Sequence, residues 1–176
     1  LSHVNGSNLK QKLRVIPQKN GDYKVEDLTA YGKIGFAVNT IDQQDLAANK
    51  NGVYKIETFY NGAQNFTIDF RKFSFDETKH LNRLIDYTHY KDEKERLQKL
   101  FLDTNNPLSL YKDKIDDGYL VIYDTVSNVY KVKISDFEGN ETNIDINIKG
   151  EDKQPNDVSK NFTSPYYIKS GEANVL

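Results

Sequence analysis

Alternation of apolar and polar residues with a period of two is the feature that most restricts the fold of this chain. Aromatic and β-branched residues occupy one side of five stretches, and polar or small residues occupy the other: residues 33–38, 54–60, 66–71, 130–134 and 143–148. This period is typical of antiparallel strands that bury one face. Weaker patterns of the same kind cover residues 9–16, 23–28 and 119–123. The sequence therefore predicts a mainly β fold.

The connections between these stretches contain the residues that tight turns need. The segments NKNGV (49–53), YNGAQN (60–65) and DFEGNET (136–142) each include an Asn-Gly or Gly-Asn pair. Glycine and asparagine tolerate the positive φ of short hairpins, and the Asp136 carboxylate can accept hydrogen bonds from N–H groups of its own turn. About seven to nine short strands at this spacing favour a sandwich. We therefore expect an antiparallel, immunoglobulin-like β-sandwich.

One region departs from the period of two. Between about residues 75 and 103 apolar residues recur at helical spacing, and Ser74 with Glu77 has the spacing of a capping box. Two further pairs have the i,i+4 spacing of helical ion pairs: Asp92–Arg96 and Glu95–Lys99. The apolar stripe falters at residues 89–94, so we expect an insertion of two helices or one kinked helix. Its apolar residues are expected to pack on the outer face of the sheet: Leu81, Leu84, Ile85 and Leu97.

Composition and charge exclude several classes of function. The 176 residues include 24 basic and 26 acidic ones, with a net charge of −2, so neither nucleic acid nor an anionic membrane is an expected partner. No apolar run approaches the ~20 residues of a membrane span. The absence of cysteine excludes disulfides, zinc-thiolate sites and a thiol nucleophile. The composition fits a soluble globular domain.

The last part of the chain differs from the rest. Residues 1–150 are expected to form the sandwich with its helical insertion. The segment EDKQPNDVSKN (151–161) is polar and without periodicity, which is typical of a linker. We interpret residues 151–176 as a linker and the start of a following element. Because the chain begins at Leu1 rather than at methionine, we also interpret it as a fragment of a longer protein.

Several stretches resemble parts of bacterial envelope proteins. GYLVIYDTVSNVYKVKISDFEGNETNIDINI (118–148) is similar in layout to the last strands of bacterial immunoglobulin-like domains. AYGKIGFAVNTIDQQDLAANKNGVYKIETFYNG (30–62), with FSFDETKHLNRLIDY (73–87) and RLQKLF (96–101), resembles the region that follows the catalytic domain in lysostaphin-type zinc metallopeptidases of Gram-negative envelopes. The resemblance covers most of the chain, about residues 1–150.

The resemblance implies a context rather than an activity. In that family an upstream domain holds zinc through H-x-x-x-D and H-x-H motifs, and water attacks a cell-wall peptide. Neither motif occurs here, where the histidines are His3, His80 and His89. We therefore expect a non-catalytic accessory domain of a cell-envelope, lysostaphin-type metallopeptidase-like protein, located in the periplasm or outer envelope. It would position or regulate its own upstream catalytic domain, or contact another envelope protein or peptidoglycan.

One loop offers ligands for calcium. Asp42, Asp45 and Asn49 carry oxygen ligands between two predicted strands. Calcium takes about six to eight oxygens, commonly with several carboxylates, and this loop has only two aspartates. The alternative is a simple connection in which Asn51-Gly52 makes the turn into the next strand. We favour the connection and keep calcium as the other hypothesis.

The remaining polar residues show no complete catalytic arrangement. His80 and His89 lie about 180° apart on a single helix, so they can share zinc only if the helix breaks between them. Solvent-facing histidines are the favoured interpretation, with a metal-dependent enzyme as the alternative. No G-x-S-x-G segment is present. No catalytic residue and no cofactor are therefore expected.

Aromatic residues supply the remaining candidate site. The chain has 12 tyrosines and 9 phenylalanines. Tyr87 and Tyr90 fall in the helical insertion, and Phe59 falls on the predicted outer face of its strand. Exposed aromatic side chains favour a binding surface for a glycan or a partner protein. An independent carbohydrate- or peptidoglycan-binding module is therefore the alternative function, and packing beneath the insertion is the alternative role of these side chains.

Overall fold

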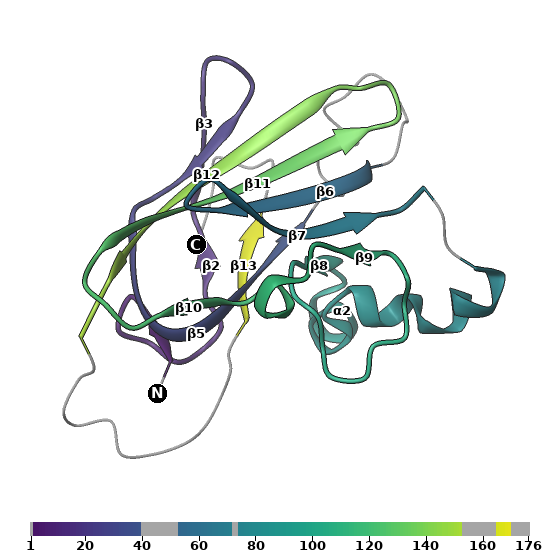
Figure 1. Ribbon diagram of the computed structural model, residues 1–176, viewed down its shortest axis with the longest axis horizontal. Coiled ribbons are helices and arrows are strands. Elements are labelled where there is room, and N and C mark those ends of the chain that lie inside the picture. The colour runs from purple at the N-terminus through teal and green to yellow at the C-terminus, as the bar shows by residue number, and fades with distance from the viewer. Residues whose placement is uncertain (1, 40–52, 72–73, 153–164, 170–176) are drawn as a thin grey trace.

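The protein is mainly β, as the period of two predicts. The computed structural model describes residues 2–39, 53–71, 74–152 and 165–169. Of these described residues, 49% lie in strands. The strands form a mixed sheet that curls into a half-barrel, with the helical insertion at one end (Figure 1). The strands of the described part are β1 (His3–Val4), β2 (Lys12–Leu13), β3 (Val15–Pro17), β4 (Tyr23–Val25), β5 (Leu28–Asn39), β6 (Val53–Tyr60), β7 (Ala63–Asp69), β8 (Leu97–Lys99), β9 (Tyr111–Lys112), β10 (Leu120–Ile122), β11 (Ser127–Asp136), β12 (Glu141–Gly150) and β13 (Pro165–Lys169).

The expected antiparallel, immunoglobulin-like sandwich is not confirmed. The sheet runs in the order β2-β13-β5-β12-β11-β6-β7-β9, and β12 pairs in parallel with both β4 and β5. Strand β13 also pairs in parallel with β2 and β5. Alternation along a strand specifies which face is buried, but it does not specify which strand lies next to it or in which direction that strand runs. The alternation could therefore not predict that parallel and antiparallel pairs occur in one sheet.

The antiparallel half of the sheet agrees closely with the predicted strands and turns. Strands β6, β7, β11 and β12 lie side by side, and β6–β7 and β11–β12 are hairpins (Figure 1). Asn61 and Gly62 take positive φ values of 50° and 83° in the first hairpin. In the second, the Asp136 carboxylate accepts hydrogen bonds from the backbone N–H groups of Glu138 and Asn140, each at 2.9 Å. The predicted role of Asp136 in its turn is confirmed.

Strand β5 is the hub of the fold. It pairs with β1, β8, β10, β12 and β13, and its path bends strongly (Figure 1). Gly32, at φ +85°, lies within β5, and a Cβ atom there would lie 2.5 Å from the Ser2 hydroxyl oxygen. Glycine is required where the backbone takes such a φ and another segment approaches this closely. Beyond Lys33 every residue of β5 is buried, so this part of the strand is covered on both faces.

The main core fills the inner face of the sheet. It combines the predicted inward side chains of the long strands with residues of the segment that follows the insertion. Its largest fully buried members are Tyr130, Phe36, Phe66, Ile34, Ile56, Ile68, Leu100, Leu110, Leu120 and Ile122.

Two side chains of β7 are buried although the alternation places them on the solvent side. Thr67 and Asp69 are only 2% and 6% exposed. The Asp69 carboxylate lies 2.7 Å from both the Arg71 guanidinium and the Lys112 ammonium group. The Arg71 guanidinium, followed by Lys112, holds the pKa of Asp69 well below its usual range. These local ion pairs explain how a carboxylate is tolerated at this position.

The insertion is helical over only part of the predicted range. A 3-10 helix, η1 (Phe75–Leu84), begins with the predicted capping box of Ser74 and Glu77, and helix α2 (Tyr87–Glu93) follows. The chain then enters strand β8, so the expectation of a helix up to about residue 103 is wrong. The two expected i,i+4 pairs are replaced by others: Glu95 lies beside His89 and Lys12, and Lys99 pairs with Asp103.

The apolar side chains of the insertion pack in two separate places. Leu84 belongs to the main core, whereas Leu97 packs on Ala37 in a separate small cluster. Gly35 lets Phe101 approach the strand, because a Cβ atom there would lie 2.7 Å from Phe101 Cδ1. The expectation that these residues cover the outer face of the sheet is therefore wrong for Leu84, Leu81 and Ile85, which lie in or against the main core, and only Leu97 packs outside it.

The boundary predicted after residue 150 stays a prediction. Strand β13 lies in the same sheet as the rest of the fold, next to β5. A further short 3-10 helix, η2 (Ile115–Gly118), precedes β10. Within the described ranges, no helix has both the length and the apolar character needed to cross a bilayer.

Candidate functional site

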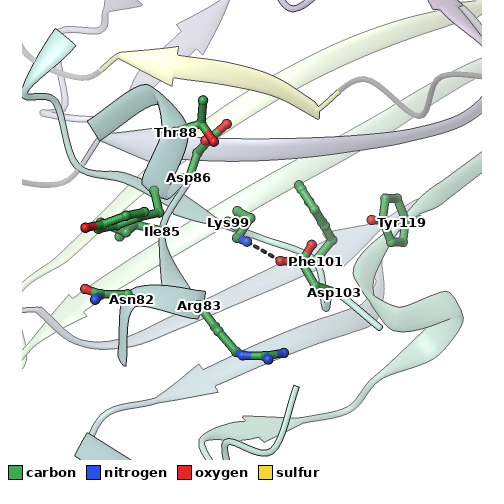
Figure 2. A pocket seen from close by; sticks show the side chains of 10 residues that line it. Asn82, Arg83, Ile85, Asp86, Thr88, Lys99, Phe101, Asp103 and Tyr119 are labelled. Atoms are coloured by element: carbon green, nitrogen blue, oxygen red, sulfur yellow. Dashed lines mark hydrogen bonds and ion pairs between the residues drawn. The ribbon is translucent and has the colours of Figure 1, made fainter. Parts of the chain in front are cut away.

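A half-open pocket of about 390 Å³ lies between the helical insertion and the segment that follows it (Figure 2). We call it the insertion pocket. Its volume falls in the range of roughly 300–1,000 Å³ that is usual for small-ligand sites. Residues from η1, α2, β8 and the loops beside them line it: Asn82, Arg83, Ile85, Asp86, Tyr87, Thr88, Lys99, Phe101, Asp103 and Tyr119.

Local sequence signals explain how the walls of the insertion pocket form. The Asp86 side chain accepts a hydrogen bond from the His89 backbone N–H at 3.0 Å. Asp86 is therefore the N-cap residue of α2, which follows η1 after a short link. On the opposite wall, Phe101 and Tyr119 pack on the face of β5 that Gly35 leaves free of a side chain. One wall therefore depends on a helix cap and the other on a glycine in a strand.

The carboxylates of the insertion pocket are both paired with lysines. Lys99 forms an ion pair with Asp103, and Lys10 approaches Asp86 to 2.5 Å from the N-terminal segment. Burial raises the pKa of Asp86, but the His89 backbone N–H, Lys10 and Lys99 together outweigh burial and lower it. Asp86 therefore carries its negative charge at neutral pH. Figure 2 shows the Lys99–Asp103 pair in the middle of the pocket, with Arg83 on one side of it and Asp86 on the other.

Aromatic rings form the apolar part of the insertion pocket. Phe101 and Tyr119 lie with their ring centroids 4.7 Å apart, and the Lys33 ammonium group lies 4.2 Å from the Tyr119 centroid. Burial, followed by the nearby charges of Asp103 and Asp117, raises the pKa of Tyr119 to about 12. The Tyr119 hydroxyl therefore stays neutral, able to donate a hydrogen bond, at physiological pH.

Of the three aromatic candidates, Tyr87 and Tyr90 lie beside each other and Phe59 lies elsewhere. Tyr87 lines the insertion pocket with 49% of its surface exposed, and its ring centroid lies 6.3 Å from that of Tyr90. The Arg96 guanidinium lies 5.7 Å from the centroid of the Tyr90 ring. Phe59 is a half-buried residue of β6, opposite Gln64, and does not line the pocket. The structure thus joins two of the three candidates.

The candidate metal ligands are not brought together. His89 lies 3.2 Å from Glu95 with only 14% of its side chain exposed, so the expectation that it faces solvent is wrong. Among the described residues no three histidine, aspartate or glutamate side chains are placed to hold a metal ion. The calcium candidates Asp42, Asp45 and Asn49 lie outside the described residues.

Several pocket residues had no signal in the sequence. Lys99 and Asp103 have i,i+4 spacing, but the pair forms across the end of a strand rather than along a helix. Tyr119 and Arg83 come from segments that only the tertiary fold brings together. Gly35 was the available clue, because a glycine within a strand often marks the close approach of another group.

No protein-family model, no curated protein and no solved structure matches this chain. The resemblance to lysostaphin-type metallopeptidases therefore rests on the quoted sequence stretches alone.

Proposed function

We propose that this chain is a non-catalytic binding module that holds a saccharide in the insertion pocket. The observation that carries the proposal is the combination of paired charges and aromatic rings in one half-open pocket. Lys99 pairs with Asp103, Lys10 pairs with Asp86, and Tyr87 remains half exposed at the same site. This combination supports a ligand that is rich in hydroxyl groups and has apolar faces.

The chemistry of a sugar ring matches this combination. Its hydroxyl groups form hydrogen bonds with planar polar groups, and the pocket supplies the Asn82 amide together with the Asp86 and Asp103 carboxylates. Its C–H faces pack on aromatic rings, which Tyr87 and Tyr119 supply. Asp86 and Asp103 each already lie beside a lysine. A neutral, hydroxyl-rich ligand can therefore bind without separating either carboxylate from its lysine.

Binding of purified cell-wall polysaccharide tests the proposal. We expect the untagged protein to be retained on the polysaccharide and retention to fall at least tenfold in Tyr87→Ala. Tyr123→Ala is the matched control, because Tyr123 is 64% exposed and does not line the insertion pocket. Retention that is absent in the wild type, or equal in both variants, would contradict saccharide binding at this site.

A role as an accessory domain beside a lysostaphin-type catalytic domain is a second proposal, supported by the resemblance of residues 30–62 and 73–87. It includes a location in the periplasm or outer envelope and contacts with the upstream domain. The coding sequence upstream of Leu1 tests it directly. A sequence there without H-x-x-x-D and H-x-H motifs would exclude this role and leave saccharide binding unaffected. As part of this second proposal, we also propose that the half of the sheet formed by β6, β7, β11 and β12 has an immunoglobulin-like origin.

A further inference from the structure

The insertion pocket contains one cationic side chain that differs from its neighbours. Arg83 lies at the end of η1, is exposed to solvent and lines the pocket. Its Nη1 atom donates a hydrogen bond to the Asn105 backbone oxygen at 2.9 Å. No ion pair joins Arg83 to a carboxylate within the part of the chain that the structure describes. Lys10 and Lys99, by contrast, each lie against a pocket carboxylate.

The contact with Asn105 fixes the guanidinium without neutralising it. A guanidinium group has five N–H donors in a planar fork, and the backbone oxygen of Asn105 uses one of them. Such a fork matches the two oxygens of a carboxylate, which it binds through two parallel hydrogen bonds. Because Asp86 and Asp103 are held by lysines, they do not compete for this fork.

The charge balance of the insertion pocket favours a single negative charge. Arg83, Lys99 and Lys10, which pairs with Asp86, carry three positive charges, and Asp86 and Asp103 carry two negative ones, which leaves one positive charge in excess. A carboxylate brings one charge to the unpaired guanidinium. A phosphate monoester brings nearly two, and both pocket carboxylates repel the excess.

We propose that the ligand of the insertion pocket is an acidic saccharide whose carboxylate is bound by Arg83. This inference rests on the proposed saccharide-binding function and narrows it to sugars of the hexuronic acid type. Tyr87 and Tyr119 contact the ring of the sugar, and Arg83 selects its charged substituent.

Titration calorimetry with a hexuronic acid oligosaccharide and its carboxyl-reduced, neutral counterpart tests the assignment. We expect the wild type to bind the acidic form at least tenfold more tightly, and Arg83→Gln to bind both forms equally. Arg83→Lys keeps the charge but not the fork, so it should retain only part of the preference. Lys79→Gln is the matched control, because Lys79 is an exposed cation of the same helix that does not line the pocket. Thermal unfolding of each variant verifies its fold.

The outcomes separate this inference from the function on which it rests. If the wild type binds both oligosaccharides equally and Tyr87→Ala binds neither, recognition of a carboxylate by Arg83 is overturned. Saccharide binding in the insertion pocket is then still supported. A preference that survives in Arg83→Gln, or a sugar phosphate that binds as tightly as the hexuronic acid, would also overturn it. Binding of neither oligosaccharide, together with no retention on cell-wall polysaccharide, would remove both proposals.

Discussion

Replacing Gly35 by alanine tests the contact that joins the insertion pocket to β5. The new Cβ atom would lie 2.7 Å from Phe101 Cδ1 and 3.1 Å from Tyr119 Cε1. Carbon atoms prefer separations of about 3.5–4.0 Å, so both rings must move outward. Such overpacking costs about 1–3 kcal/mol, and the lower entropy of the unfolded alanine chain returns about 0.5–1 kcal/mol. We expect a net loss of about 0–2.5 kcal/mol in the free energy of unfolding.

Urea unfolding followed by circular dichroism measures this loss, and a double-mutant cycle identifies its cause. Phe101→Leu removes ring atoms from the contact, so it should be less harmful in the Gly35→Ala background than in the wild type. The expected coupling is about 0.5–2 kcal/mol, within the range for residues in direct contact. Additive effects of the two substitutions would refute the packing of Phe101 on Gly35.

Three further substitutions test other parts of the structure. Leu97→Ala is expected to lower the free energy of unfolding by about 2–5 kcal/mol, because Leu97 is 1% exposed; a loss below about 1 kcal/mol in urea unfolding would argue against a buried strand β8. Asp86→Ala removes the cap of α2 and should cost about 0.5–2 kcal/mol, with Thr88→Ala, from the first turn of that helix, as the less harmful control. Asp69→Asn is expected to cost about 1 kcal/mol at pH 7, because Arg71 and Lys112 are half exposed and solvent weakens their ion pairs. The pKa of Asp69 is lowered in the folded state, so this stabilisation is fully present above the unfolded pKa of about 3.9 and is lost progressively as the pH falls from there through the lower folded pKa. The difference between the unfolding curves of wild type and Asp69→Asn should therefore begin to shrink below about pH 4, and a difference that stays constant down to pH 2 would contradict the ion pairs.

The parts of the fold that local patterns specify were predicted well. The strands around Tyr130, Ile146 and Ile56 follow the period of two, and the turns at Asn61-Gly62 and Asp136 follow the needs of φ and backbone hydrogen bonding. Contacts between distant segments were beyond such patterns. Residues 97–99 read as helical because Leu97, Leu100 and Phe101 have helical spacing, yet pairing with β5 makes them a strand. Tertiary pairing overrides the local preference there.

The candidate site shows the same division. Tyr87 and Tyr90 were recognised because they are aromatic residues in a polar insertion. Arg83, Lys99 and Tyr119 became part of the same site only through the folding of three separate segments over β5. A lone arginine or lysine in a charged sequence has no spacing that distinguishes it from a solvated surface residue.

The central position of β5 has a consequence for how the chain is made. Strand β5 ends at Asn39, but its neighbour β12 begins only at Glu141 and its neighbour β13 at Pro165. During synthesis the apolar side chains of β5 therefore leave the ribosome long before these partners exist. Topologies dominated by such distant pairings fold slowly and expose strand edges to aggregation in the meantime. The segment around Phe36 and Val38 thus exposes its apolar side chains until β8 and β13 have been made.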